Sequence, residues 1–422
     1  MKTIAIGIFI LTYGLLMFFP KIRAYIALVA AAIFVILGIL PLDKVFFAVN
    51  WNVILMIAGT MGVVSLFIES KMPALLADII IEKTPDVKWA IISLSIFAGF
   101  ISAFVDNVAT VLMVAPVALV IAKKLNISPV PSIIAIAIAS NLEGAATLVG
   151  DTTSILLGGY AHMDFIDFIF YHGKPGLFFI VQIALVASIA VLLFIFRKEK
   201  QPVVALERAT VEDYFPTFLL CGMVLLLILA SFLPVKPEIT NGIICVTLFI
   251  VGMIRSYFKT KDIQVFRRGL SEIDYFTVML LTGLFIVIGG LTEAGVVNDI
   301  AALFVRISGD NIFVVYTLIV WASVFLSAFI DNIPYVATML PVVGGIATLL
   351  NVEPTVLYFG LLCGATLGGN LTPIGASANI AGLGILRRAG YEVKPWTFMK
   401  ISIPFTMAAV LVGYVLVWVL FR

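Results

Sequence analysis

The stretch that decides the fold of this chain is Ser102-Ala-Phe-Val-Asp106-Asn107-Val-Ala-Thr-Val-Leu-Met-Val-Ala-Pro116. A second copy reads Ser327-Ala-Phe-Ile-Asp331-Asn332-Ile-Pro-Tyr-Val-Ala-Thr-Met-Leu-Pro341, and 331 − 106 and 341 − 116 both give an offset of 225. Each copy therefore carries a carboxylate and an amide in the middle of an apolar segment. A charged side chain at the centre of a bilayer costs about 2.5 kcal/mol or more, so a carboxylate there indicates a functional site.

The composition predicts an all-α polytopic membrane protein. Of the 422 residues 62% are hydrophobic and 12% charged, and the mean hydropathy is +1.19. Runs of about 20 apolar residues are long enough to cross the hydrocarbon core as helices, and the short alternating segments of a barrel do not occur. The three cysteines lie scattered in apolar spans without metal-binding spacing. We expect the lipid bilayer as the surroundings, no cofactor, no enzymatic activity and no nucleic-acid partner.

Apolar spans and interrupted segments divide the chain. Plain spans are expected near residues 3–20, 24–40, 51–69, 177–197, 215–234, 239–257, 275–293 and 399–420. Two helical hairpins, 88–124 and 311–350, have an Asp-Asn tip, and two helices, 131–160 and 355–386, are interrupted by Gly, Thr, Asn and Pro. The predicted units are a first transmembrane helix at 1–23, a repeat at 24–197, a cytoplasmic linker with a connecting helix at 198–238, and a second repeat at 239–422.

The distribution of basic residues predicts the topology. If both hairpins re-enter on one side and the loop 197–213 is cytoplasmic, 20 of the 26 Lys and Arg residues, Arg23 among them, face the cytoplasm. This bias follows the positive-inside rule. It makes the two repeats inverted relative to each other and places both termini outside a cell (inner) membrane.

The repeat extends to the broken helices. Glu143-Gly-Ala-Ala-Thr147-Leu-Val-Gly150-Asp151-Thr-Thr-Ser154 aligns, again at 225, with Gly368-Gly-Asn370-Leu-Thr372-Pro-Ile-Gly375-Ala-Ser377-Ala-Asn379. Inverted repeats with broken helices are typical of secondary transporters, whose site lies near the bilayer midplane. The candidate substrate- and ion-binding residues are Asp106, Asn107, Asn141, Glu143, Gly144, Thr147, Gly150, Asp151, Asp331, Asn332, Gly369, Asn370, Thr372, Gly375, Ser377 and Asn379.

These residue types favour a coupling cation. Carboxylate, amide and hydroxyl oxygens are hard ligands, so we expect Na⁺ or H⁺ at Asp106, Asn107, Asp331 and Asn332. The sequence places no Lys or Arg beside the acidic residues, and unpaired buried carboxylates hold a proton or exchange it for a cation. The alternative for the two aspartates is that each caps the helix after its tip. The alternative for Glu143 is an interfacial or a structural, hydrogen-bonded carboxylate.

At these motifs the sequence resembles the ion transporter superfamily, particularly the branch of arsenical-pump permeases, P proteins and D-type sodium/proton antiporters. The resemblance covers nearly the whole chain. It implies a homodimer that works as an elevator, with a soluble ATPase partner if the chain is of the arsenical-pump type. Related sodium/dicarboxylate symporters carry Ser-Asn-Thr where this chain has Asp106-Asn107-Val108. P-like members have Gly-Asp-Pro-Pro where this chain has Gly150-Asp151-Thr152-Thr153, which is nearer to the D-type antiporters.

The function predicted is therefore coupled transport of a small inorganic ion or oxyanion, with arsenite-type efflux favoured. Sodium/proton antiport and transport of citrate or another carboxylate remain alternatives, and a passive channel is a more distant one. An intramembrane aspartyl protease also needs two aspartates, but the first glycine of its Gly-x-Gly-Asp signature is absent at Leu148-Val-Gly150-Asp151, and a protease gives no reason for an inverted repeat.

Overall fold

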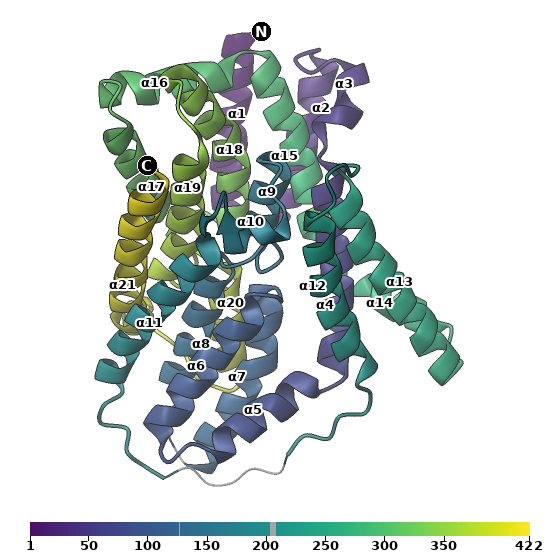
Figure 1. The fold of residues 1–422 in the computed structure, drawn as a ribbon, viewed down its shortest axis with the longest axis vertical. Coiled ribbons are helices and arrows are strands. Elements are labelled where there is room, and N and C mark those ends of the chain that lie inside the picture. Colours follow the sequence, from purple (N-terminus) through teal and green to yellow (C-terminus); the bar gives the residue numbers. More distant parts are fainter. Residues whose placement is uncertain (126, 203–207) are drawn as a thin grey trace.

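The computed structural model describes residues 1–125, 127–202 and 208–422 (Figure 1). Helices make up most of these residues, and the strands among them are the antiparallel pair β1 (Phe170–Tyr171) and β2 (Lys174–Pro175). The prediction of an all-α membrane protein is confirmed. Residues 203–207 of the predicted linker, and residue 126 between the first hairpin and the first broken helix, lie outside the described residues.

The two halves contain matching helices in the same order. The helices of the first half, with the one that precedes it, are α1 (Lys2–Phe18), η1 (Pro20–Ile22), α2 (Arg23–Ile36), α3 (Leu42–Ala48), α4 (Trp51–Glu69), α5 (Met72–Glu82), α6 (Val87–Ser102), α7 (Asn107–Lys124), α8 (Val130–Glu143), α9 (Thr152–Tyr160), α10 (Phe165–Ile169) and α11 (Leu177–Ile195). The connecting helix is α12 (Phe215–Ser231). The second half has α13 (Thr240–Thr260), α14 (Gln264–Ser271), α15 (Tyr275–Glu293), α16 (Val296–Ser308), α17 (Ile312–Ser327), α18 (Asn332–Leu350), α19 (Thr355–Gly368), η2 (Gly369–Leu371), α20 (Ser377–Arg388) and α21 (Pro395–Phe421).

Within the described residues, the helices long and apolar enough to cross a membrane are α4, α7, α11, α13, α15, α18 and α21. Two pairs pass this test only together: α1 with η1 and α2, bent by 111°, and α16 with α17, bent by 116°. The break between α1, which ends at Phe18, and η1, which begins at Pro20, lies close to the boundary expected between the spans at 3–20 and 24–40. It falls there because a proline has no N–H to continue a helix and its ring clashes with the preceding turn.

The hairpins α6–α7 and α17–α18 come from opposite ends of the molecule. In Figure 1 the first lies in the lower half and the second in the upper half, with α5 below and α16 across the top. Between them run α8 and α19, whose residues 132–143 and 355–368 are all buried. A helix that is buried on every side belongs to a protein core, so the two broken helices form the centre of the fold.

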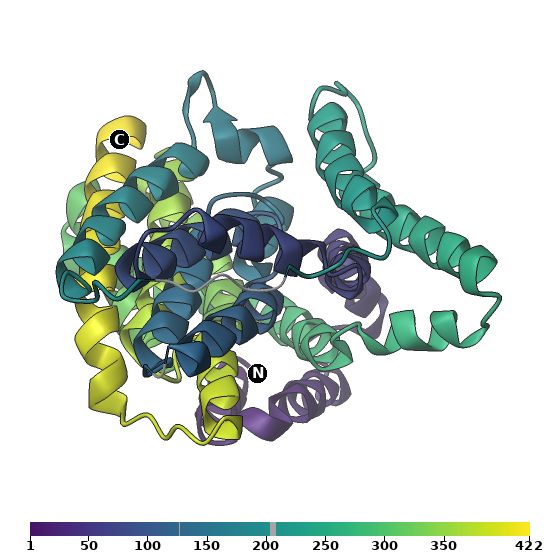
Figure 2. The same ribbon diagram turned by 90° about the horizontal axis from the view of Figure 1, so that it is seen from below.

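A second group of helices packs through two equivalent close crossings. α4 packs against α13 and α2 packs against α15. A Cβ on Gly59 of α4 would lie 2.5 Å from the Cys245 carbonyl carbon, and one on Gly283 of α15 would lie 2.6 Å from that of Ala27. Only glycine permits such an approach, as is common where membrane helices cross. Seen from below, α12, α13 and α14 lie along one edge of the molecule (Figure 2).

Candidate functional site

Both broken helices are tied to the hairpin of their own half by the same hydrogen bond. α8 ends at Glu143, and the chain becomes helical again at Thr152. In this gap the Thr147 hydroxyl donates to the Ala103 carbonyl, and in the other half the Thr372 hydroxyl donates to the Ala328 carbonyl. The two pairs are related by the 225-residue offset. Carbonyls at a helix end have no intrahelical partner, so each threonine satisfies an end of the helix that leads to the tip.

Glycines bring the backbone of the breaks close to the hairpins. A Cβ on Gly150 would lie 3.0 Å from the Ser102 and Ala103 carbonyl oxygens, and a Cβ on Gly375 would lie 2.8 Å from those of Ser327 and Ala328. A Cβ on Gly144 would lie 2.6 Å from the Asn107 side chain. These glycines, and Gly369 beside Gly375, therefore act by their small size.

At each tip an aspartate caps the helix that follows it. Asp106 Oδ2 accepts from the backbone N–H groups of Val108 and Ala109, and Asp331 Oδ1 accepts from that of Ile333. Asp106 lines a cavity, and among the described residues none donates to its second oxygen. The cap proposed as the alternative reading is present, and it leaves one carboxylate oxygen of Asp106 free.

A chain of amides joins the two halves. Asn107 Nδ2 donates to Asn141 Oδ1 (3.1 Å), and Asn141 Nδ2 donates to the Thr366 carbonyl (2.8 Å) and to Asn370 Oδ1 (3.1 Å). Asn370 Nδ2 in turn donates to the Ile138 carbonyl (2.8 Å). All these side chains are at least nine-tenths buried. A buried polar network of this kind fixes its members rigidly when each is satisfied.

Asp151 connects the first broken helix to the second tip. Its Oδ2 accepts from the Thr153 hydroxyl (2.8 Å) and from Asn332 Nδ2 (3.3 Å), and it is 6% exposed. The Thr153 hydroxyl also lies 3.1 Å from that of Thr366. The tip of the second hairpin is thus held against the break of the first half.

These groups surround a cavity of about 260 Å³. It is lined by six of the predicted site residues: Asp106, Asn107, Asn141, Asp151, Asn332 and Ser377. Its other polar lining, which the sequence reasoning missed, comes from Arg23, Ser65, Thr152, Glu272, Asp274 and Thr277. The remaining predicted residues do not line it, and the threonines and glycines among them hold its walls together.

Arg23 corrects the expectation that no basic residue accompanies the acidic ones. Its Nη1 lies 2.6 Å from Asp331 Oδ2, and the two side chains are 15% and 14% exposed. The prediction assigned Arg23 to a cytoplasmic stretch. In the structure it is the first residue of α2 and lies beside Asp331 of the second tip. Pro20, directly after the first apolar span, was the signal in the sequence for a turn at this point.

Glu143 lies away from this cavity. It is fully buried at the end of α8, where its Oε2 accepts from Gln182 Nε2 of α11 (2.6 Å), and its Oε1 has no partner in the described part of the chain. Asn379 is also fully buried and donates to the carbonyls of Gly369 and Thr372. Neither residue is brought to the Asp-Asn tips.

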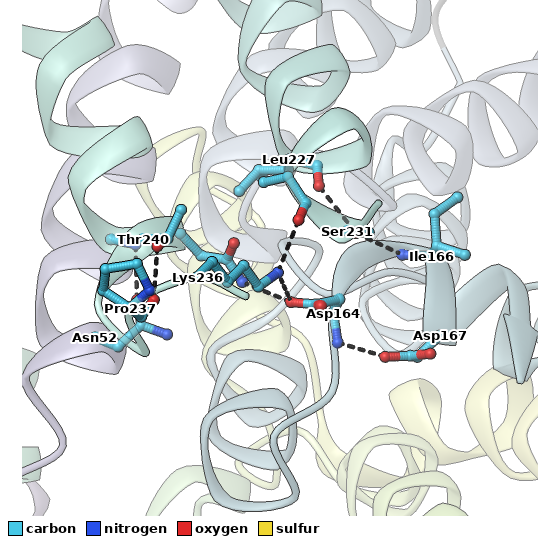
Figure 3. Close-up of polar contacts among 12 residues, drawn as sticks. Asn52, Asp164, Ile166, Asp167, Leu227, Ser231, Lys236, Pro237 and Thr240 are labelled. Carbon is cyan, nitrogen blue, oxygen red and sulfur yellow. Dashed lines mark hydrogen bonds and ion pairs between the residues drawn. The ribbon is translucent and has the colours of Figure 1, made fainter. Parts of the chain in front are cut away.

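A larger cavity of about 1120 Å³ lies between α3, α9, α13, α15 and α18, and none of the predicted site residues lines it. At its wall Lys236 Nζ contacts Asp164 Oδ1 (2.5 Å), and Ile166 N–H donates to Ser231 Oγ (3.4 Å) (Figure 3). Asn52 Oδ1 accepts from Gly242 N–H nearby. We place the candidate site in the smaller cavity because the carboxylates and amides of both halves converge there.

Comparison with known proteins gives a family and a fold. A family model described as citrate transporter matches residues 13–364. The chain is 33% identical to an uncharacterized transporter of Mycobacterium tuberculosis, over 99% of this chain and 98% of that protein. It is 27% identical to the human P protein, over 97% of this chain and 59% of that protein.

Two solved structures are similar in fold. The Alcanivorax borkumensis YdaH transporter matches with a TM-score of 0.59 and 16% identity, over 89% of this chain and 87% of that chain. Neisseria gonorrhoeae MtrF, described with a class of antimetabolite efflux pumps, matches with a TM-score of 0.56 and 14% identity, over 87% and 80%. At these identities the likeness concerns the fold alone.

Proposed function

Because this chain belongs to the citrate transporter family, and is thus a multi-pass membrane transporter, we propose that it is a secondary active transporter of a small inorganic ion or oxyanion, coupled to H⁺ or Na⁺. The observation that carries the proposal is the convergence of Asp106, Asp151 and Asn332 from both halves at one cavity. The family establishes transport, and the choice of solute and coupling ion rests on the chemistry of this site.

The oxygens around the cavity suit a small hard cation. Asp106 offers a free carboxylate oxygen, Asp151 a carboxylate, and Asn107 and Asn332 amide oxygens. Such oxygens are the preferred ligands of alkali and alkaline-earth ions, and a carboxylate in apolar surroundings also accepts a proton. We propose that the coupling ion binds at Asp106, Asn107 and Asn332 together with Asp331.

The charges around the cavity limit the net negative charge of the solute that can bind there. Four carboxylates, those of Asp106, Asp151, Glu272 and Asp274, line the cavity. They accompany one guanidinium, that of Arg23, which is already paired with Asp331. A solute with several negative charges would need cations bound beside it, so citrate alone fits this site poorly. The cavity of about 260 Å³ is also smaller than the roughly 300 Å³ or more typical of pockets for larger organic ligands. An arsenite-type oxyacid, small and rich in hydroxyl groups, fits both limits.

Sodium/proton antiport is the second candidate. It is favoured by the oxygen-rich wall of the cavity, which supplies a cation site without requiring a further solute. In either case we propose an elevator motion, in which the hairpins and broken helices move against the group formed by α2, α4, α13 and α15. We also propose a homodimer in the cell (inner) membrane with both termini external, and a soluble ATPase partner if the solute is arsenite.

The test is flux through the purified chain in proteoliposomes with an imposed pH gradient. Arsenite, ²²Na⁺ and citrate are offered separately, and internal pH is followed with a trapped dye. Arsenite movement that depends on the proton or sodium gradient supports the proposal, and exchange of Na⁺ for H⁺ alone supports the second candidate. Flux that is not coupled to either gradient contradicts both and favours a channel.

A further inference from the structure

Arg23 is the cationic side chain among the described residues that line the 260 Å³ cavity, where the other charged groups are Asp106, Asp151, Glu272 and Asp274. It uses one nitrogen, Nη1, to contact Asp331 Oδ2. Its Nε is buried and has no hydrogen-bond partner in the described part of the protein. A guanidinium has five N–H donors in a planar fork that matches two oxygens of one anion, so this fork is largely unused.

Asp331 does not depend on Arg23 alone. Its Oδ1 accepts from the Ile333 N–H (3.1 Å), and its Oδ2 also accepts from the Ser377 hydroxyl (3.3 Å). The carboxylate therefore keeps partners on its own hairpin and on α20 when the guanidinium turns to another oxygen. The Arg23 guanidinium carbon lies 5.9 Å from the centre of the Phe276 ring, which supports the planar group on one side.

The counterpart of Arg23 in the other half is neutral. At the two close crossings Ala27 corresponds to Cys245, and 245 − 27 gives 218. The same offset relates Arg23 to Asn241, which lines the larger cavity. A positive charge is thus present at one of the two equivalent positions only, beside the cavity that holds the Asp-Asn tips.

Resting on the proposed function, we propose that Arg23 recognises the transported solute by binding an anionic oxygen of a small oxyanion or carboxylate, in place of one of its contacts with Asp331. A single guanidinium among several carboxylates selects one anionic group per solute. The fork geometry further selects two oxygens on one centre. Arg23 is therefore a specificity-determining residue, and it belongs to α2, outside the hairpins and broken helices.

The experiment compares wild-type protein with Arg23→Gln and Arg23→Lys in proteoliposomes, with arsenite, inorganic phosphate and citrate as probes and Na⁺/H⁺ exchange as a parallel readout. A lost charge-assisted hydrogen bond weakens affinity on the order of 10- to 100-fold. We expect KM for the transported anionic probe to rise by that factor in Arg23→Gln and by less in Arg23→Lys, which keeps the positive charge. The matched control is Arg255→Gln, since Arg255 pairs with Asp213 outside this cavity.

Each outcome is decisive. Wild-type protein that transports none of the probes contradicts the proposed function itself. If wild-type protein transports an anionic probe and Arg23→Gln has the same KM for it, the inference is contradicted but the proposed function stands. If wild-type protein exchanges Na⁺ for H⁺ without moving any probe, the inference is also overturned. If Arg23→Gln does not fold, Arg23→Lys carries the test, and an unchanged KM in it overturns the inference.

Discussion

Asn141 and Thr366 occupy equivalent positions in the two halves, 225 residues apart, and are joined by a hydrogen bond from Asn141 Nδ2 to the Thr366 carbonyl of 2.8 Å. Thr366 lies in the last turn of α19, where carbonyls lack an intrahelical partner. The relation between the halves is thus a direct contact between corresponding residues, at the point where both central helices end and the site begins.

Replacing Asn141 by alanine should destabilise the protein. The change removes the acceptor of Asn107 and the donor to Thr366 and Asn370 inside the core. Each buried polar group left without a partner costs about 1–3 kcal/mol. Thermal unfolding in detergent measures the loss, with the exposed Gln264→Ala as the control. Equal melting temperatures for Asn141→Ala and wild type would mean that the network does not hold the halves together.

Gly375→Ala should destabilise the protein more than Gly384→Ala. A Cβ on Gly375 meets the Gly369 carbonyl oxygen at 2.5 Å, whereas a Cβ on Gly384 meets nothing within 4 Å. Backbone oxygens cannot move aside cheaply, and an alanine in the interior of α20 favours the helix by roughly 0.5–1 kcal/mol. Melting temperatures of both variants decide the matter. If Gly375→Ala melted at the wild-type temperature, the broken helix α19–α20 would not need the close backbone contact at Gly375.

Particular residues show what the sequence could predict. The Asp-Asn hairpins and the broken helices were predictable because a repeat constrains both copies at once. Convergence of Asp106, Asn107, Asp151 and Asn332 followed from the same symmetry. The place of Arg23 in the site was not predictable from the repeat, because its counterpart Asn241 is neutral and belongs to no repeated motif. In the sequence Arg23 looks like one more basic loop residue of the positive-inside pattern. Glu143 was predicted to belong to the site because it lies in the repeated motif. In the structure its side chain instead accepts a hydrogen bond from Gln182.

Asp213, on the side of the protein predicted to be cytoplasmic, should make the free energy of unfolding depend on pH in the acid range. Its partial burial raises the pKa, but hydrogen bonds from Arg255, the Phe215 N–H and Lys259 outweigh this and lower the pKa from 3.8 to about 2. An aspartate with a lowered pKa stabilises the fold above the unfolded value and loses that contribution as pH falls through the folded one. The stability difference between wild type and Asp213→Asn should therefore shrink between pH 3.8 and about 2. A constant difference in denaturant unfolding over this range would contradict the role of the ion pairs.

The predicted topology can be tested by cysteine labelling. Lys261→Cys, in the loop region 255–274, should react with a membrane-impermeant maleimide only from the cytoplasm, and His172→Cys, within 161–174, only from outside. Both positions are exposed. The exposed native Cys221 is first replaced by serine, whereas Cys245 and Cys363 are buried. Labelling from the opposite faces would reverse the predicted orientation.

Coupling at the two Asp-Asn tips is tested by flux through Asp106→Asn and Asp331→Asn proteins. The flux measured is that of the solute that wild-type protein transports, driven by a pH gradient. Asparagine keeps the size of the side chain and can still cap a helix, but it removes the charge that binds a cation or proton. Folding, followed by melting temperature, should survive in Asp106→Asn, and gradient-driven flux should fail in both. Asp331→Asn should also lose stability, since it leaves Arg23 without its counter-charge. If both proteins kept wild-type flux with the same dependence on pH, the two aspartates would be helix caps alone, and the account of coupling at this cavity would be wrong.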